Sequence, residues 1–150
     1  MTIEILKEFI TAHQPSATFD ETAEWLNITI EPTTWKTIAR LLREPPHNFD
    51  FLFCETCIDW KTNLTMVYHL TSTLHRLPIV IKAVLDRTNP IIETVCDIWR
   101  TAEMLEREVY ELFGVIFTGH PDLRRLILTD DFEGFPLRKD FEDPINMIKL

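Results

Sequence analysis

Two N-terminal stretches of the chain carry apolar side chains at the spacing of an amphipathic helix. The first covers residues 2–12, stops before Pro15, and has the apolar face Ile3, Leu6 and Ile10. The second opens at Pro32, which suits the first position of a helix, and ends at Pro45-Pro46. Its apolar face consists of Trp35, Ile38, Leu41 and Leu42. These patterns predict two short helices, each with one face to bury.

Other stretches have the pattern of strands. "EWLNITIE" alternates apolar and polar residues, which is typical of a half-buried strand. "FDFLFCETCIDW" and "LTMVYHLTS" flank the polar turn Lys61-Thr62-Asn63 and predict an antiparallel hairpin, and "LPIVIKAVL" predicts a further strand. The fold class that follows is α+β, with a mixed or antiparallel sheet covered on one face by the two N-terminal helices.

Beyond Asn89-Pro90 the apolar residues return to helical spacing, up to Gly114, which suits a left-handed helix end. Residues 115–150 hold only short apolar groups between turn signals, so we expect little regular structure there. The chain therefore divides into an α+β globular part over residues 1–88, a helical segment over 89–114 and an extended, largely irregular C-terminal arm over 115–150. At 150 residues these parts form one domain overall.

Charge and hydropathy narrow the classes of partner. A net charge of −9 disfavours binding to nucleic acid or to an anionic membrane surface. The N-terminus carries Glu4, Lys7 and Glu8 within its apolar stretch, which is unlike a signal peptide, and the apolar runs are too short for a membrane span. We expect any membrane association to come through a partner.

Residue counts exclude several cofactor sites. Three cysteines cannot supply the four thiolates of a cubane iron–sulfur cluster, and three widely spaced glycines cannot form a dinucleotide or phosphate loop. Cys54 and Cys57 have the spacing of a redox dithiol, but they lie in a strand pattern and point to opposite faces, which favours core packing over a redox or metal role. Cys96 is isolated. We predict no cofactor in this chain.

Catalytic candidates are weak. His120, Pro121 and Asp122 could join Glu106, Glu108 and Glu111 in a metal or acid–base group, and a small stand-alone metal-dependent hydrolase would be the function that follows. The spacing matches no known ligand set, and salt bridges and loop structure explain the same residues. We predict no catalytic residue and no metal ligand.

The arm is unusual because charged residues of both signs alternate with phenylalanines between Glu106 and Phe141. Arginine beside aromatic rings suits a protein interface. One interpretation is an arm that becomes ordered on a partner, and the other is a tail folded back over its own sheet.

Three consecutive motifs then indicate a family. "ERE-x-Y-x-L-F-G-V", "G-H-P-D-L-R-R-L-x-L" and "D-D-F-E-G-F-P-L-R-K-D" closely resemble the signature of the C subunit of proton-pumping NADH:quinone oxidoreductase, the thirty-kilodalton-type subunit of respiratory complex I. Glu111 stands where the family usually has aspartate, and Thr129 where proline is common.

The resemblance implies a non-catalytic subunit of the peripheral arm, on the cytoplasmic side of the cell inner membrane. FMN, iron–sulfur clusters and quinone would lie in partner subunits, and the C-terminal arm would contact the large quinone-site D subunit and its neighbours. The equivalent subunit of an energy-converting hydrogenase or of a ferredoxin-linked quinone oxidoreductase is the alternative. The interface residues that the resemblance implies are Glu106, Arg107, Glu108, Tyr110, Gly114, His120, Pro121, Arg124, Gly134, Pro136, Leu137, Arg138, Lys139 and Asp140.

Overall fold

The structure, a computed structural model, describes residues 1–146, so the last four positions of the predicted arm lie outside the described residues. The described chain has helices α1 (Ile3–His13), α2 (Pro32–Arg43) and α3 (Ala102–Phe113). Its strands are β1 (Thr18–Asp20), β2 (Leu26–Ile30), β3 (Phe51–Asp59), β4 (Asn63–Ser72), β5 (Leu77–Asp86), β6 (Ile91–Glu93) and β7 (Ile116–Thr118). The α+β class and both N-terminal helices are confirmed.

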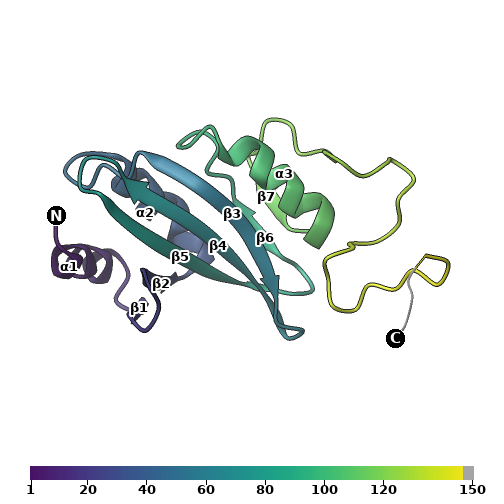
Figure 1. The fold of residues 1–150 in the computed structure, drawn as a ribbon, viewed down its shortest axis with the longest axis horizontal. Coiled ribbons are helices and arrows are strands. Elements are labelled where there is room, and N and C mark those ends of the chain that lie inside the picture. Colours follow the sequence, from purple (N-terminus) through teal and green to yellow (C-terminus); the bar gives the residue numbers. More distant parts are fainter. Residues whose placement is uncertain (147–150) are drawn as a thin grey trace.

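The main sheet is mixed and has the strand order β1-β2-β5-β4-β3 (Figure 1). The predicted hairpin is confirmed, because β3 and β4 pair antiparallel, and β4 pairs antiparallel with β5 in turn. Strand β2 runs parallel to β5, which the intervening α2 and hairpin make possible. The period-2 pattern therefore predicted the strands, while the pairing of β2 with β5 depends on contacts distant in sequence.

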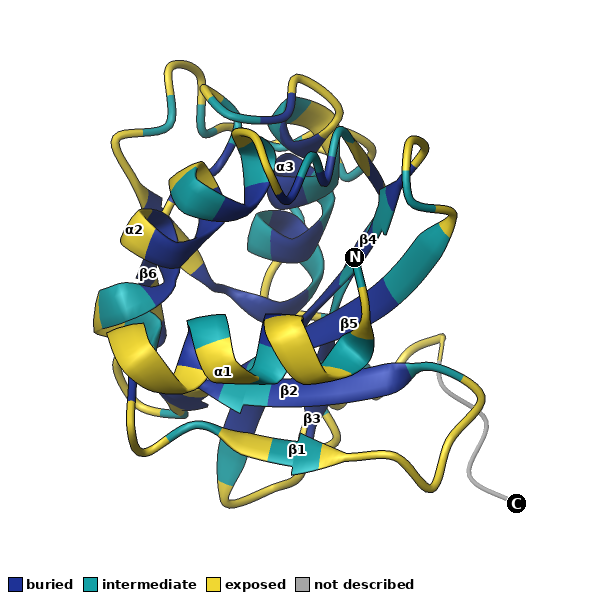
Figure 2. Cartoon of the chain, turned by 90° about the vertical axis from the view of Figure 1, so that its left-hand side faces the viewer, coloured by how far each residue is buried: buried dark blue, intermediate teal, exposed yellow. Residues whose placement is uncertain are grey.

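A single hydrophobic core lies between the sheet and the helices, as the dark blue segments inside Figure 2 indicate. Strand β4 contributes alternate residues to it, Leu64, Met66 and Leu70, all fully buried. Helix α2 adds Trp35, whose ring lies 4.7 Å from that of Tyr68 on β4. Helix α2 lies against β5 and β6, and α3 lies against β3 and β7. The placement of both N-terminal helices on one sheet face stays a prediction.

The region after Pro90 differs from the predicted helical segment. Residues Ile91–Glu93 form strand β6, which pairs in parallel with β7, and the helix begins only at Ala102. Strand β7 is likewise a short regular element within an arm that we expected to be irregular, and β1 was not predicted. Three-residue strands show too little of their period to be recognised, and the β6–β7 pair joins segments 25 positions apart.

Between residues 1 and 146, none of the helices combines the length and the apolar character that crossing a membrane requires.

Candidate functional site

The C-terminal arm follows β7 and leaves the globular part as a long extended segment, drawn in yellow-green to yellow in Figure 1. The signature residues lie on α3 and along this arm. Their side chains fall into two groups: some tie the arm to the domain, and others face outward. The inward bonds agree with the interpretation of a tail held on its own domain, while contact of the exposed side chains with a partner stays a prediction.

The first anchor is Glu106, the first acid of the "ERE" motif. Its side chain is completely buried, and its carboxylate accepts hydrogen bonds from the Thr94 hydroxyl and from the Val95 N–H, at 2.7 Å for the latter. Burial raises the pKa of Glu106 to about 7, although these two hydrogen bonds oppose the rise. Glu106 thus holds the segment between β6 and α3 from within the core, and its side chain is not exposed to a partner.

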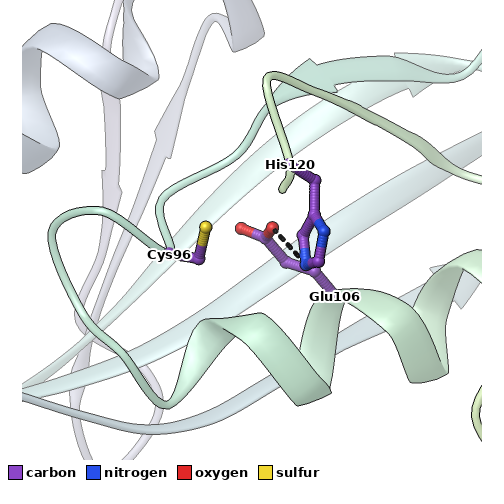
Figure 3. Close-up of side chains that lie close together, drawn as sticks. All are labelled: Cys96, Glu106 and His120. Carbon is purple, nitrogen blue, oxygen red and sulfur yellow. Dashed lines mark ion pairs between the residues drawn. The ribbon is translucent and has the colours of Figure 1, made fainter. Parts of the chain in front are cut away.

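His120, at the start of the arm, lies beside Glu106 with Nε2 3.7 Å from its carboxylate (Figure 3). Its Nδ1 accepts the Asp122 N–H at 3.0 Å, so Nε2 carries the proton and donates to the Glu103 carbonyl at 2.9 Å. Both ring nitrogens are engaged, and the neutral imidazole fits both bonds. His120 is therefore a residue that shapes the turn into the arm.

Cys96, Glu106 and His120 bring a sulfur, an oxygen and a nitrogen within 4.8 Å of one another (Figure 3). Zinc accepts such a donor set. A metal ion bound at His120 Nε2 would replace the proton that bonds the Glu103 carbonyl, and a proton moved to Nδ1 would then conflict with the Asp122 N–H. Burial raises the pKa of the Cys96 thiol, which disfavours the thiolate ligand. Glu106 and His120 therefore fit a hydrogen-bond network better than a metal centre.

A second anchor comes from the next two turns of α3. The Arg107 guanidinium donates to the carbonyls of Arg124 and Arg125, at 3.0 and 2.8 Å. One turn later, the Glu111 carboxylate accepts three consecutive backbone N–H groups, those of Leu126, Ile127 and Leu128. Burial would raise the pKa of Glu111, but these N–H donors outweigh it and lower the pKa.

Arg107 and Glu111 thus bind five consecutive residues of the arm through its backbone. Arg107 and Glu111 have the i, i+4 spacing of an ion pair along a helix, but both side chains form their hydrogen bonds with the arm. The aspartate usual in the family would have one methylene less to reach across this gap.

The third anchor lies where α3 ends. Gly114 has a left-handed backbone with φ of 77°, and the ring of Phe135 lies over it, so that an added Cβ would meet the ring at 2.7 Å. Arg138 donates through Nε to the Phe113 carbonyl at 2.6 Å, and its guanidinium lies 4.8 Å from the Phe135 ring centroid. The Leu137 N–H donates to the Leu112 carbonyl at 3.1 Å. The glycine is required both by its φ and by the close approach of the ring.

The last anchor joins the end of the signature to two residues outside it, Asp59 and Arg87. Asp59, at the end of β3, accepts the N–H of Lys139 at 2.8 Å, and Arg87 pairs with both Asp59 and Asp140. The "RKD" stretch of the arm is thereby fixed to the turn between β3 and β4.

The outward-facing part of the arm is rich in apolar side chains. Leu126, Ile127 and Leu137 are exposed by 39%, 71% and 53%. Isolated exposed apolar residues are ordinary on a protein surface, but several along one segment whose polar groups are already bonded inward indicate a contact surface. The anchors and the exposed side chains alternate within the same stretch of chain.

The fourteen predicted interface residues therefore divide by burial. Those buried in the domain are Glu106, Arg107 and Gly114; those half-buried are Glu108, Tyr110, His120, Pro136 and Arg138; those exposed are Pro121, Arg124, Gly134, Leu137, Lys139 and Asp140. The structure brings them together along α3 and the arm. Whether they contact a partner stays a prediction, and the buried members can act only by holding the exposed ones.

One buried acid, Glu55, is not among the candidate residues predicted from the sequence. Glu55 lies on the core side of β3, opposite Tyr68, and neither carboxyl oxygen has a hydrogen-bond partner within residues 1–146. Burial and the nearby charge of Glu106 raise the pKa of Glu55 well above its usual range, so it is held as the neutral acid. A glutamate at an inward position of the alternating stretch "FLFCETCI" was the signal that could have identified it.

The cysteines fit part of the prediction: Cys57 is packed in the core, but Cys54 is only half-buried. Cys54 pairs with His69 and Cys57 with Met66, so the two thiols point to opposite faces of the sheet. All three cysteines are free. Burial raises the pKa of Cys57 to about 12, which makes a reactive thiolate there unfavourable.

Comparison with known protein families gives one match over most of the chain. Residues 28–145 match the family described as the respiratory-chain NADH dehydrogenase, 30 Kd subunit. The NADH-quinone oxidoreductase C subunit of Roseiflexus sp. (strain RS-1) is 38% identical over 119 residues, which cover 77% of this chain and 68% of that protein.

A second relative is a longer protein. The NADH-quinone oxidoreductase C/D subunit of Phocaeicola vulgatus is 45% identical over 111 residues, which are 73% of this chain but only 21% of the relative. The chain thus spans about a fifth of that relative's length.

Among solved structures, the chain resembles one in a structure described as the membrane-bound sulfane sulfur reductase, an archaeal respiratory membrane complex. The TM-score is 0.78 with 29% sequence identity, over 93% of this chain and 85% of that one.

Proposed function

The chain belongs to the family of the 30-kDa subunit of respiratory-chain NADH dehydrogenase, and on this premise we propose that it is a non-catalytic subunit of the peripheral arm of a proton-translocating NADH:quinone oxidoreductase. Its role is to hold other subunits in the geometry that electron transfer from NADH to quinone requires. The chain would contribute to an enzyme by assembly, without a reaction of its own.

The observation that carries this proposal is the split of the arm into inward polar anchors and outward apolar side chains. Glu111 and Arg107 satisfy the arm's backbone groups on the domain's side, and Ile127 and Leu137 remain exposed. An arm ordered in advance loses less conformational entropy when a partner binds. A surface of this kind fits a stable protein partner better than a substrate.

The large quinone-site D subunit is the partner that we propose for the arm, with neighbouring peripheral subunits beside it. The support is that a relative whose name joins C and D carries a matching segment in one longer chain. Two proteins that function as one polypeptide in some organisms commonly lie in contact.

We place FMN, the iron–sulfur clusters and the quinone in the partner subunits. The support comes from the cysteines: three thiols are fewer than the four that a cubane cluster takes, and Cys57 is held as a thiol in the core. From the family we also propose that the chain sits on the cytoplasmic side of the inner membrane and reaches the membrane through the complex.

A second candidate is the equivalent subunit of a different respiratory complex. The similarity to a chain of the sulfane sulfur reductase structure favours it specifically, because its TM-score is 0.78 over 93% of this chain. The fold suits either assembly, and the identity of the partners decides between them.

The test is affinity purification of the tagged full chain from gently solubilised membranes, with mass spectrometry of the recovered proteins. We expect subunits that carry flavin, iron–sulfur clusters and the quinone site. Recovery of sulfur-reductase or hydrogenase subunits would establish the second candidate, and recovery of the chain without partners would refute both.

A further inference from the structure

The clearest group outside the family signature is a charged cluster at the turn between β3 and β4. Asp59 closes β3, and its side chain is only 2% exposed. Its carboxylate accepts the Lys61 N–H at 2.7 Å and the Lys139 N–H at 2.8 Å, and it also pairs with Arg87 at the end of β5. Burial would raise the pKa of Asp59, but these donors lower it to about 2. Asp59 is therefore an ionised, fully bonded carboxylate.

Arg87 extends the cluster to the arm. Its second terminal nitrogen lies 2.8 Å from the Asp140 carboxylate, and its own side chain is only 15% exposed. One arginine thus joins the hairpin turn to an arm residue more than fifty positions away. The arm is thus fixed through the backbone N–H of Lys139 and the side chain of Asp140, and the side chain of Lys139 takes no part in these bonds.

This cluster brings together exposed side chains from two segments that are distant in the sequence, the hairpin turn and the arm. Trp60, next to Asp59, is 56% exposed, and the Lys139 ammonium lies 5.8 Å from the centroid of its ring. Leu137, two residues before Lys139, is 53% exposed. An exposed tryptophan is the kind of side chain that anchors a protein interface, because its large ring is apolar and its N–H can bond a partner.

Two lysines of this corner form no ion pair within residues 1–146. The acids Asp59 and Asp140 both pair with Arg87, whereas Lys61 lies exposed in the turn and the Lys139 ammonium lies over the Trp60 ring. The nearby acid Asp86 is bonded to Thr88. Lysines without an acidic partner beside an exposed tryptophan are complementary to a segment that carries carboxylates.

We propose that Trp60, Lys61, Leu137 and Lys139 form a single docking surface for a segment of a partner subunit that presents carboxylate side chains beside an apolar one. This inference rests on the proposed function and extends the interface from the arm to the hairpin turn. Asp59 and Arg87 are its positioning residues, because they hold the two halves of the surface together before the partner arrives.

The direct test is site-specific crosslinking in the intact complex. Trp60 is replaced by the photoreactive p-benzoyl-phenylalanine in the tagged full chain, and Leu74, which is 69% exposed on the turn between β4 and β5, receives the same replacement as a matched control. We expect an adduct at position 60 with a partner peptide that contains aspartate or glutamate, and none at position 74. Adducts only with lipid, or equal adducts at both positions, would overturn the proposal.

A charge-reversal variant tests this surface separately from the rest of the arm. Lys139→Glu keeps the backbone N–H that Asp59 binds, and Arg76→Glu makes the same change in charge on the turn between β4 and β5. We expect Lys139→Glu, compared with Arg76→Glu, to lower the recovery of the partner by about tenfold, as for loss of a close interfacial charge pair. Equal recovery with the two variants would contradict the proposed charge complementarity.

Asp59→Asn tests the positioning role, with Asp20→Asn on the exposed strand β1 as its control. The variant should weaken recovery of the partner and increase hydrogen exchange at the Lys139 amide, while the amides that Glu111 binds stay protected. Unchanged exchange at Lys139 would refute the positioning role.

The outcome also distinguishes this inference from the proposed function. If Arg138→Ala, which removes the third anchor of the arm, loses the partner while the Trp60 and Lys139 variants retain it, only the docking surface is wrong. If the unmodified chain recovers no partner subunit at all, the proposed function itself fails.

Discussion

Replacing Glu106 by glutamine should change how the stability of the chain depends on pH. Glu106 is buried next to Thr94 and Val95, and burial raises the pKa of its carboxyl to about 7 from the ordinary 4.5. Because the folded-state pKa is the higher one, the folded chain keeps a proton that the unfolded chain has already released between these two values. The contribution of Glu106 to stability is therefore fully present below pH 4.5 and is lost as the pH rises to about 7.

The size of this loss follows from the two pKa values. A tenfold change in proton affinity corresponds to about 1.4 kcal/mol, so the interval from 4.5 to about 7 corresponds to about 3 kcal/mol. Glu55, whose pKa is raised in the same direction, adds to the decline. His47 and His69 act in the opposite direction in this range, because burial lowers the pKa of both, so the wild-type curve alone is not diagnostic.

The assay is urea unfolding of the purified full chain at several pH values from 4.5 to 8, for the wild type, Glu106→Gln and a control, Glu8→Gln, at an exposed position of α1. Glutamine can accept only one of the two hydrogen bonds, so a constant loss of stability is expected. The informative quantity is the slope of the free energy of unfolding against pH. From pH 4.5 to 8 the free energy of unfolding of Glu106→Gln should decline by about 3 kcal/mol less than that of the wild type. The curve of the control should run parallel to that of the wild type. Parallel curves for all three chains would refute the reasoning.

Two substitutions and one labelling experiment test the anchors and the core. Glu111→Gln should loosen residues 126–128 and lower stability by about 1.5–3 kcal/mol, as for charge-assisted hydrogen bonds, with faster proteolysis of the arm as the measurement; unchanged cleavage would contradict the anchor. Gly114→Ala should cost at least about 1–2 kcal/mol for its left-handed φ alone, and the clash with Phe135 adds to it; a melting temperature equal to that of the wild type would be inconsistent with the observed φ of 77°. Cys57, with a pKa of about 12, should react with iodoacetamide more slowly than Cys54 at pH 8 in the folded chain, and both should react alike in urea; equal rates in the folded chain would show that Cys57 is accessible as a thiolate.

The sequence predicts the elements that are long enough to show their period. The helix with the apolar face Ile3, Leu6 and Ile10, and the hairpin on either side of Lys61-Thr62-Asn63, both extend over at least two repeats of their pattern. Strand β6 could not be predicted in this way, since its three residues form a strand only because β7 returns beside them. The parallel pairing of β2 with β5 also depends on tertiary contacts that leave no local pattern.

The candidate site illustrates a second limit. The motif identifies Glu106 and Arg107 as important positions, but it does not tell whether a charged side chain points toward a partner or toward its own domain. In the structure Glu106 is buried and Arg107 binds the arm's own carbonyls. Only burial and hydrogen bonding, which depend on the fold, separate the residues that hold the surface from those that form it. Asp59 could not be found from the motif at all, because its partners Arg87 and Lys139 come from other segments.

The central claim is that the chain acts through assembly and takes no part in the chemistry. The most direct measurement compares two quantities in membranes of an Arg138→Ala strain and of the wild type: the amount of assembled complex on a native gel, and the rate of NADH oxidation by quinone per assembled complex. Because Arg138 bonds the arm to the Phe113 carbonyl, we predict less assembled complex and an unchanged rate per complex. A normal amount of complex with a lost rate would contradict the claim.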